Sequence, residues 1–137
     1  MTGRKKDRKI EALRGVPLFA GFGTRDLKAL AKISDEVDLP AGTEAIREDD
    51  LGRQFFVLLA GEAQVRRRGR ARRMLGPGDF FGEIALVTNR PTEATVTTTT
   101  EVRALVIGWP AFRKLLRSSP GVQLKVLQAL AERVTGD

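Results

Sequence analysis

The stretch from Phe80 to Val96 reads FFGEIALVTNRPTEATV and interrupts a long run of strand-like sequence. Gly82 and Glu83 are followed by a short helical pattern, and Pro91 then leads into a second β-branched run. A glycine that begins a helical turn presents free backbone N–H groups, and such groups hold phosphate without many side chains. This stretch is therefore the first candidate for a ligand site.

Short β-type runs surround this stretch from Val37 to Ile107, with turn signals every eight to twelve residues. The spacing is typical of an all-β roll or barrel. The run from Gln54 to Ala60 is almost continuously apolar, which indicates a strand buried on both faces. The predicted strands are Glu36 to Leu39, Thr43 to Arg47, Gln54 to Ala60, Ala63 to Arg67, Ala71 to Leu75, Thr95 to Thr99 and Val102 to Ile107.

Helical patterns lie on both sides of the strand region. Arg4 to Arg14 is amphipathic and ends at Gly15, and a second helix, capped by Thr24, ends near Ser34. Trp109 to Arg117 and Val122 to Val134 follow the strands, separated by Ser119-Pro120. The residues expected to face the core are Ile10, Leu13, Leu27, Leu30, Ala31, Ile33, Trp109, Phe112 and Leu116. Val126, Leu127, Leu130 and Val134 give the last helix one apolar stripe, which is expected to be core or a self-association surface.

The order of helices, strands and helices predicts an α+β fold. It is an antiparallel β-roll, or jelly-roll barrel, with N-terminal helices and two C-terminal helices. The 137 residues and the 42% hydrophobic content suit one domain with its own core. Phe55, Phe56 and Phe80 are expected in that core.

The composition favours a binding protein over an enzyme. The sequence has no histidine and no cysteine, which excludes serine–histidine and cysteine–histidine nucleophiles, disulfides and thiolate metal sites. No apolar run approaches the roughly 20 residues of a membrane span, and the amino terminus lacks the apolar segment of a signal peptide. The expected location is the cytoplasm.

The formal net charge of +7 is concentrated in two segments. Five of the first nine residues are basic, and Arg66, Arg67, Arg68, Arg70, Arg72 and Arg73 follow one another around Gly69. The second segment is predicted to be a hairpin whose arginines are solvated, although it could also bind an acidic partner.

Together with its flanks, the stretch that opens this section resembles the phosphate-binding cassette of the cyclic-nucleotide-binding domain family. The likeness is carried by FGEIAL and PTEATV, by LGPGDF before them and by VPLFAGFGTRDLKALAKI near the amino terminus. The family includes bacterial cAMP receptor-type regulators, regulatory subunits of protein kinase A and cyclic-nucleotide-gated channels. The resemblance implies that residues 16–137 form a nucleotide-binding β-roll closed by a helix, after a basic tail or helix at residues 1–15.

The family cassette reads roughly F-G-E-[LI]-[AS]-L and then P-R-[AST]-A-[TS]-V. By resemblance, Glu83 accepts the ribose 2′-hydroxyl, and backbone amides of the cassette hold the cyclic phosphate. The ligand is expected to be cAMP rather than cGMP, with no metal and no further cofactor. The residues expected to form the site are Phe81, Gly82, Glu83, Ile84, Ala85, Leu86, Arg90, Thr92, Ala94 and Thr95.

The chain departs from the family pattern where the cassette pairs with the phosphate. Thr92 stands in the place of the family arginine, and Glu93 in the place of a small residue. A charge-assisted bond contributes roughly 1.5 to 3 kcal/mol, so its loss weakens binding by about one to two orders of magnitude. Glu93 is expected to add a like charge near the phosphate, and Arg90 is the candidate substitute cation.

Three functions are compatible with these patterns. The first is a stand-alone cAMP sensor that transmits binding by moving Val122 to Val134. The second is a domain that has lost its ligand and serves as a scaffold for interaction or dimerisation, with a protein effector or a second copy as partner. The third is non-specific association with nucleic acid through the basic tail and hairpin. Sequence-specific DNA is not an expected partner, because no helix-turn-helix follows the last helix.

Overall fold

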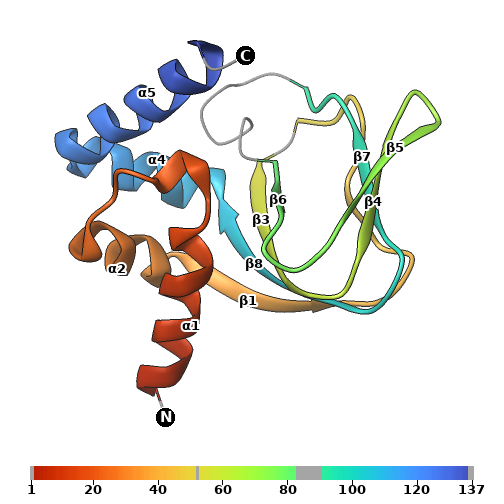
Figure 1. Ribbon diagram of the computed structural model, residues 1–137, viewed down its shortest axis with the longest axis horizontal. Coiled ribbons are helices and arrows are strands. Elements are labelled where there is room, and N and C mark those ends of the chain that lie inside the picture. Colours follow the sequence, from red (N-terminus) through yellow and green to blue (C-terminus); the bar gives the residue numbers. More distant parts are fainter. Residues whose placement is uncertain (1, 52, 83–90, 136–137) are drawn as a thin grey trace.

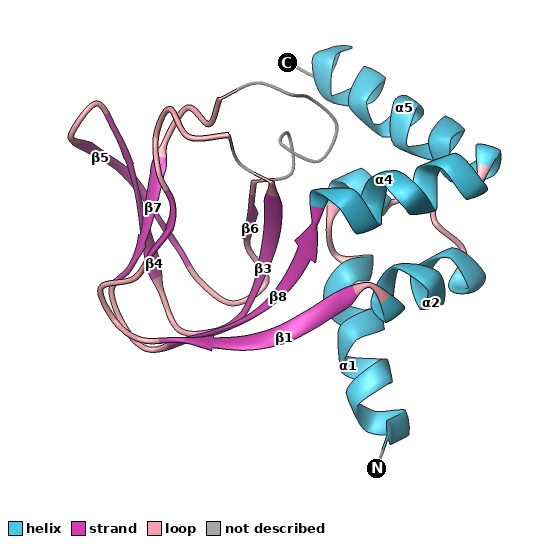
Figure 2. Ribbon diagram, turned by 180° about the vertical axis from the view of Figure 1, so that it is seen from behind, coloured by secondary structure: helices cyan, strands magenta, loops and turns pink. Residues whose placement is uncertain are grey.

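The computed structural model describes residues 2–51, 53–82 and 91–135, with the helices gathered on one side of a β-roll (Figures 1 and 2). The helices are α1 (Thr2–Arg14), the 3₁₀ helix η1 (Pro17–Phe19), α2 (Thr24–Lys32), α4 (Trp109–Ser118) and α5 (Pro120–Thr135). The strands are β1 (Ser34–Leu39), β2 (Glu44–Ile46), β3 (Gln54–Ala60), β4 (Ala63–Arg67), β5 (Arg70–Leu75), β6 (Phe80–Phe81), β7 (Thr95–Thr98) and β8 (Val102–Gly108). The expected α+β fold, a β-roll with helices before and after it, is confirmed.

The strands form two four-stranded antiparallel sheets, in the orders β1-β8-β3-β6 and β2-β7-β4-β5. We call them sheet A and sheet B. Strand β8 is a central strand of sheet A, and β7 is a central strand of sheet B. The buried Thr98 joins the β1–β2 turn to β7, because its hydroxyl donates to the Pro40 carbonyl at 2.7 Å and accepts from the Thr43 N–H at 2.9 Å.

Strand β3 contributes to two separate hydrophobic cores. Phe55 and Val57 point to the helices, while Phe56 and Leu58 point into the roll, as the alternation of a strand requires. All four side chains are buried. The expected burial on both faces is therefore confirmed for the middle of this strand, whereas its end residues, Gln54 and Ala60, are exposed.

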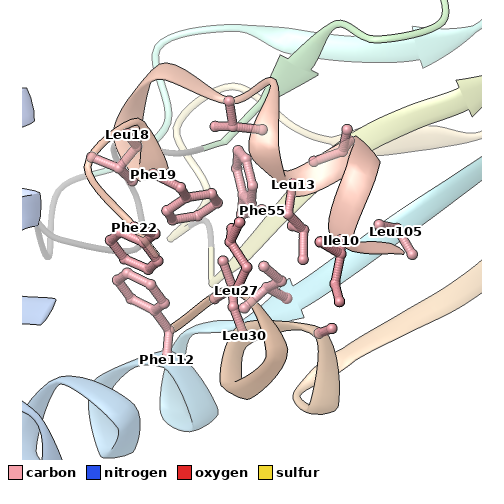
Figure 3. Close-up of a cluster of buried hydrophobic side chains, with 14 of the residues drawn as sticks. Ile10, Leu13, Leu18, Phe19, Phe22, Leu27, Leu30, Phe55, Leu105 and Phe112 are labelled. Carbon is pink, nitrogen blue, oxygen red and sulfur yellow. The ribbon is translucent and has the colours of Figure 1, made fainter. Parts of the chain in front are cut away.

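The outer core lies between sheet A and the helices and is centred on Phe19 of η1 (Figure 3). The Phe19 ring lies 5.2 Å from the ring of Phe22, 5.7 Å from that of Phe55 and 6.2 Å from that of Phe112, measured between centroids. Leu27 of α2 is fully buried in the same cluster. The short helix η1 thus packs against sheet A in the same cluster as α2 and α4.

The inner core lies between the two sheets. Phe56 of β3 stacks on Phe81 of β6, with the ring centroids 4.8 Å apart and the planes 15° from parallel. The other buried members are Ile46, Leu58, Ala63, Leu75, Val96, Val102, Ala104 and Val106. Together with Phe56 and Phe81, these residues come from seven strands of the two sheets, so this core fixes one sheet relative to the other.

Three features of the fold differ from the sequence-based expectations. Thr24 is the first residue of α2 rather than its cap; Gly23 occupies the cap position in extended conformation and no side chain caps the helix. Trp109 does not enter the core: its half-buried ring lies between the guanidinium groups of Arg53, 5.5 Å away, and Arg113, 5.0 Å away. Strand β6 was not expected, because two residues are too few to show an alternation.

The arginine-rich segment is the hairpin of β4 and β5 at one edge of sheet B, which we call the arginine ribbon. Its turn uses Arg68 and Gly69 at φ values of 52° and 75°, the left-handed geometry that two-residue hairpins favour. All six arginines are exposed, as expected. Both views place this ribbon and α1 on opposite sides of the molecule, so the two basic segments do not form one surface (Figures 1 and 2).

The outer core predicts a large effect for one substitution in α4. Phe112→Ala removes a fully buried ring that contacts Phe19, and we expect it to lower the free energy of unfolding by about 3 to 5 kcal/mol. Leu124→Ala, at a side chain that is 56% exposed, is the control and should change it by less than about 0.5 kcal/mol. Urea unfolding followed by circular dichroism measures both. Equal losses would contradict this description of the core.

Candidate functional site

The first described part of the cassette is the turn that ends β6. Gly82 adopts a φ of 84°, a left-handed conformation that glycine tolerates best. A Cβ atom at this position would lie 2.5 Å from the Gln54 carbonyl oxygen and 3.0 Å from Cδ1 of Ile46. The preceding Phe81 is held in the inner core by its stack on Phe56. The chain therefore leaves β6 with its backbone pressed against β3.

Thr92 is bound to the loop between β2 and β3. Its hydroxyl donates to the carbonyl oxygens of Arg47 and Asp50, its N–H donates to the Asp50 carbonyl at 2.8 Å, and its own carbonyl accepts from the Asp49 N–H at 2.8 Å. A β-bridge between Leu51 and Pro91 adds to this attachment. The residue in the place of the family arginine therefore fixes two loops to each other, and its hydroxyl is directed to the protein's own carbonyls.

The next three residues each have a different environment. Glu93 is directed outward: its carboxylate lies 3.6 Å from the Arg67 guanidinium, and its side chain is 80% exposed. Ala94 is half-buried, and no described residue accepts a hydrogen bond from the N–H of Glu93 or Ala94. The Thr95 hydroxyl accepts from the Glu48 N–H at 2.9 Å. Two backbone donors at the start of β7 are thus without a partner among the described residues.

The remaining expected site residues, Glu83, Ile84, Ala85, Leu86 and Arg90, lie outside the described residues. The structure therefore brings together the two ends of the site: Phe81 and Gly82 on one side, and Thr92, Ala94 and Thr95 on the other. The two ends meet at neighbouring residues of one segment: Ile46, the last residue of β2, lies against Gly82, and the carbonyl of Arg47 accepts a hydrogen bond from Thr92.

A hollow of about 270 Å³ lies beside these two ends. Ile46 and Gln54, which lie against Gly82, form part of its wall, and so does Thr92. Arg47 and Arg53 contribute cations to the lining, and Arg47 is paired with Glu44 at 3.0 Å. The volume is slightly below the lower end of the usual range for small-ligand sites.

The helix expected to act as a lid, α5, packs against the amino-terminal helices. Val122 and Val126 are its buried side chains, and the Lys125 ammonium donates to the Asp26 carboxylate of α2 at 2.7 Å. Leu127 was expected in an apolar stripe that is either core or self-association surface, and it does not face the core: Leu127 is 63% exposed, because the buried face follows Val122 and Val126 at a spacing of four. The side chains of Leu130 and Val134 lie outside the described part.

A second hollow, of about 480 Å³, lies away from the cassette between α1 and sheet A. It is lined by Asp7, Arg8, Glu11, Leu59, Ala60 and Arg103. The Arg103 guanidinium donates to the Asp38 carboxylate at 3.0 Å, and this hydrogen bond raises the pKa of Arg103. This side chain therefore carries its charge at any physiological pH.

Among the described residues, no group of three or more aspartate and glutamate side chains could hold a metal ion. Nor is any described helix long and apolar enough to cross a membrane.

The family model of the cyclic nucleotide-binding domain matches residues 36–119, which include both described ends of the cassette. The chain belongs to the cyclic nucleotide-binding domain family. This result confirms the resemblance inferred from FGEIAL and PTEATV. The matched region begins in β1 and ends after α4, so it contains the β-roll except for the first two residues of β1.

Curated relatives of this domain are regulatory proteins. A cAMP-dependent protein kinase regulatory subunit of Eremothecium gossypii is 34% identical over 119 residues, which are 85% of this chain and 26% of the relative. A CRP-like cAMP-activated global transcriptional regulator of Mycobacterium tuberculosis is 30% identical over 129 residues, which are 90% of this chain and 58% of the relative. The chain thus spans between about a quarter and three fifths of these proteins.

Solved structures share the fold over most of the domain. The N-terminal domain of a transcriptional regulator from Streptomyces coelicolor A3(2) superposes with a TM-score of 0.83 at 30% identity, covering 91% of this chain and 93% of that one. The regulatory domain of Toxoplasma gondii PKA, crystallised with cAMP, has a TM-score of 0.74 at 32% identity, covering 80% of this chain and 44% of that one.

Several contacts of the site were not evident in the sequence. The attachment of Thr92 to Arg47 and Asp50 joins residues more than 40 positions apart, and nothing in either segment signals the other. The Glu93–Arg67 pair had one available signal, since an acidic residue in the cassette and an arginine-rich hairpin are complementary in charge. The Lys125–Asp26 pair had no comparable signal.

Gly82 yields a prediction with a matched control. Gly82→Ala combines an unfavourable φ with a collision against the Gln54 carbonyl, whereas Gly78→Ala, at a φ of 90°, has no atom within 4 Å of the added Cβ. The backbone conformation alone costs about 1 to 2 kcal/mol. We expect Gly82→Ala to lose at least about 1 kcal/mol more unfolding free energy than Gly78→Ala in urea titrations. Indistinguishable losses would show that the backbone of Gly82 is not closely packed.

Proposed function

We propose that this domain binds a cyclic nucleotide, cAMP in preference to cGMP, and acts as a regulatory module rather than an enzyme. The observation that carries the proposal is the left-handed turn at Gly82, which begins the cassette against the wall of β3. The N–H groups of Glu93 and Ala94, which have no acceptor among the described residues, support it from the other end. The names of the curated relatives in Eremothecium and Mycobacterium supply the choice of cAMP.

In this proposal the ribose and the phosphate are held by different parts of the cassette. The Glu83 carboxylate accepts the ribose 2′-hydroxyl. The backbone N–H groups from Gly82 to Leu86 and those of Glu93 and Ala94 donate to the phosphate, with Thr95 closing this end of the cassette. Such donors are neutral, so a site that relies on them binds a singly charged phosphodiester more weakly than one that adds a guanidinium.

The output would be a change in the position of α5. Among the described residues, α5 is held by the buried Val122 and Val126, by Ala129 packed against the outer core, by the hydrogen bond from the Gln123 amide to the Leu116 carbonyl and by the pair between Lys125 and Asp26. Nucleotide binding would favour one of two positions of this helix according to its differential affinity for them. The exposed Leu124 and Leu127 provide an apolar surface that a protein effector or a second copy could contact.

The first prediction from this proposal concerns backbone amide shifts. NMR titration with cAMP should give saturable shifts centred on Gly82 to Leu86, Ala94 and Thr95, with a smaller response to cGMP. Glu83→Ala should remove them, while Leu124→Ala, at an exposed position of α5, should leave the affinity unchanged. No cassette shifts at millimolar nucleotide would refute the sensor and favour the scaffold, the second function compatible with the sequence.

A second prediction addresses the departure from the family pattern. Thr92→Arg combined with Glu93→Ala should strengthen cAMP binding by about one to two orders of magnitude, because it supplies the missing charge-assisted bond. The matched control is Thr99→Arg combined with Glu101→Ala, which makes the same two changes, and the same change in net charge, at exposed residues after β7. Isothermal titration calorimetry measures the affinities. Equal gains in the two variants would mean that only net charge matters.

A second candidate function is supported by the arginine ribbon. The side chains of Arg70, Arg72 and Arg73 have no carboxylate partner among the described residues, and exposed arginines attract the phosphates of nucleic acid without reading its sequence. We propose non-specific nucleic-acid association through this ribbon. The bulge opposite Val65 and the flanking charges disfavour strand addition, so a partner would contact side chains rather than the edge of the sheet.

Salt dependence tests this second function. Fluorescence anisotropy with a 20-base-pair duplex of mixed sequence, between 50 and 200 mM NaCl, should show binding that weakens steeply with salt. Changing Arg70, Arg72 and Arg73 to Gln should weaken binding at least about tenfold and flatten the salt slope. The control changes Arg25, Lys28 and Lys32 of α2, which are also exposed, and should have a small effect. Equal losses of affinity in the two triple variants would mean that these arginines act only through the net charge of the protein.

A further inference from the structure

The arginine ribbon contacts the cassette through the side chain of Arg67. Its Nη2 lies 3.6 Å from Oε2 of Glu93. Strands β4 and β7 are antiparallel, with Arg66 opposite Thr95, so the next position of β4 places Arg67 beside Ala94. Of the described residues, Arg67 is thus the cation whose backbone position and side chain both adjoin the second end of the site.

Arg67 also projects from the inner face of sheet B. Side chains alternate along a strand, and Arg67 has the same parity as Ala63, which is fully buried in the inner core, and as Val65. The partner of Val65 on β7 is Val96, another inner-core residue. The Arg67 side chain therefore leaves the strand on the inner side of sheet B, at the end where the cassette enters β7, and its guanidinium extends outward to the Glu93 carboxylate.

The contact with Glu93 is weak and reversible. The side chains of Arg67 and Glu93 are 50% and 80% exposed, and a solvated ion pair contributes little net free energy. A phosphodiester offers the same guanidinium two oxygens in a geometry that allows paired hydrogen bonds. A phosphate held by the N–H of Ala94 would therefore compete with the Glu93 carboxylate for Arg67.

Three neighbouring arginines each contact a side chain that lies outside the cassette. Arg47 is paired with Glu44 at 3.0 Å, Arg53 stacks on Trp109, and Arg66 donates to the side-chain oxygen of Gln64 at 2.9 Å.

We infer that Arg67 is the cation that pairs with the phosphate of a bound cyclic nucleotide, and that Glu93 is a carboxylate that competes for it and lowers the affinity. The inference rests on the proposed nucleotide-binding function and adds a specificity-determining pair to it. It places the positive charge on strand β4 instead of in the cassette. It also gives Glu93 a defined effect, since the carboxylate must be displaced from Arg67 before the phosphate can bind there.

Four variants test this inference by calorimetric titration with cAMP. Arg67→Gln should weaken binding about tenfold or more, because one charge-assisted pair is lost. Glu93→Gln should strengthen it several-fold. The double variant should match Arg67→Gln alone, because Glu93 acts only through Arg67. Arg72→Gln, in the same ribbon with the same change in charge, should stay within about twofold of the original protein.

A second readout separates phosphate contact from a general charge effect. The Nε–H resonance of the Arg67 side chain should shift on titration with cAMP in the original protein, and it should shift less with adenosine, which has no phosphate. If cAMP binds while Arg67→Gln behaves like Arg72→Gln, the inference is overturned and the proposed function stands. If cAMP binds neither the original protein nor the variant with Thr92→Arg and Glu93→Ala, both fail together.

Discussion

The whole domain depends on a strand that has no solvent-facing side along its middle. Phe55 and Val57 of β3 hold the helices against the roll, while Phe56 and Leu58 hold the two sheets together. The β3 backbone therefore lies between the two cores and contributes side chains to both. A packing change on either face of this strand is transmitted to the other, because protein interiors are densely packed and do not absorb volume changes locally.

The candidate site takes its geometry from the same strand. Phe81 is positioned by its stack on Phe56, and the next residue, Gly82, lies directly against the Gln54 carbonyl at the start of β3. The second end of the site is positioned by the loop that leads into β3, through the hydrogen bonds of Thr92. Both ends of the cassette are thus positioned by β3 or by the loop that leads into it. A single rigid element therefore fixes where the ligand donors lie.

Much of the fold was predictable because it follows from local pattern. The continuous apolar run from Gln54 to Ala60, the alternation along β4 and β8 and the glycine turn of the hairpin identified the roll, and the cassette sequence identified the family. Contacts between distant segments were not predictable in the same way. The exposure of Leu127 depends on which face of α5 meets η1, and the surface position of Trp109 depends on two arginines, Arg53 and Arg113, of which one lies far away in sequence. Likewise, the hydroxyl of Thr92 finds its acceptors only in the folded chain.

The central positions of β7 and β8 also bear on how the chain folds. These two strands follow each other at residues 95–108, yet each completes a different sheet, and their partners β1 and β2 lie more than fifty residues earlier. Neither sheet can assemble until this late segment is present. Such long-range pairing makes folding slow relative to helical domains of similar size. During synthesis, the inner apolar face of β3 would not be fully covered until β7 and β8 have left the ribosome, which makes this interval the period of greatest exposure to aggregation.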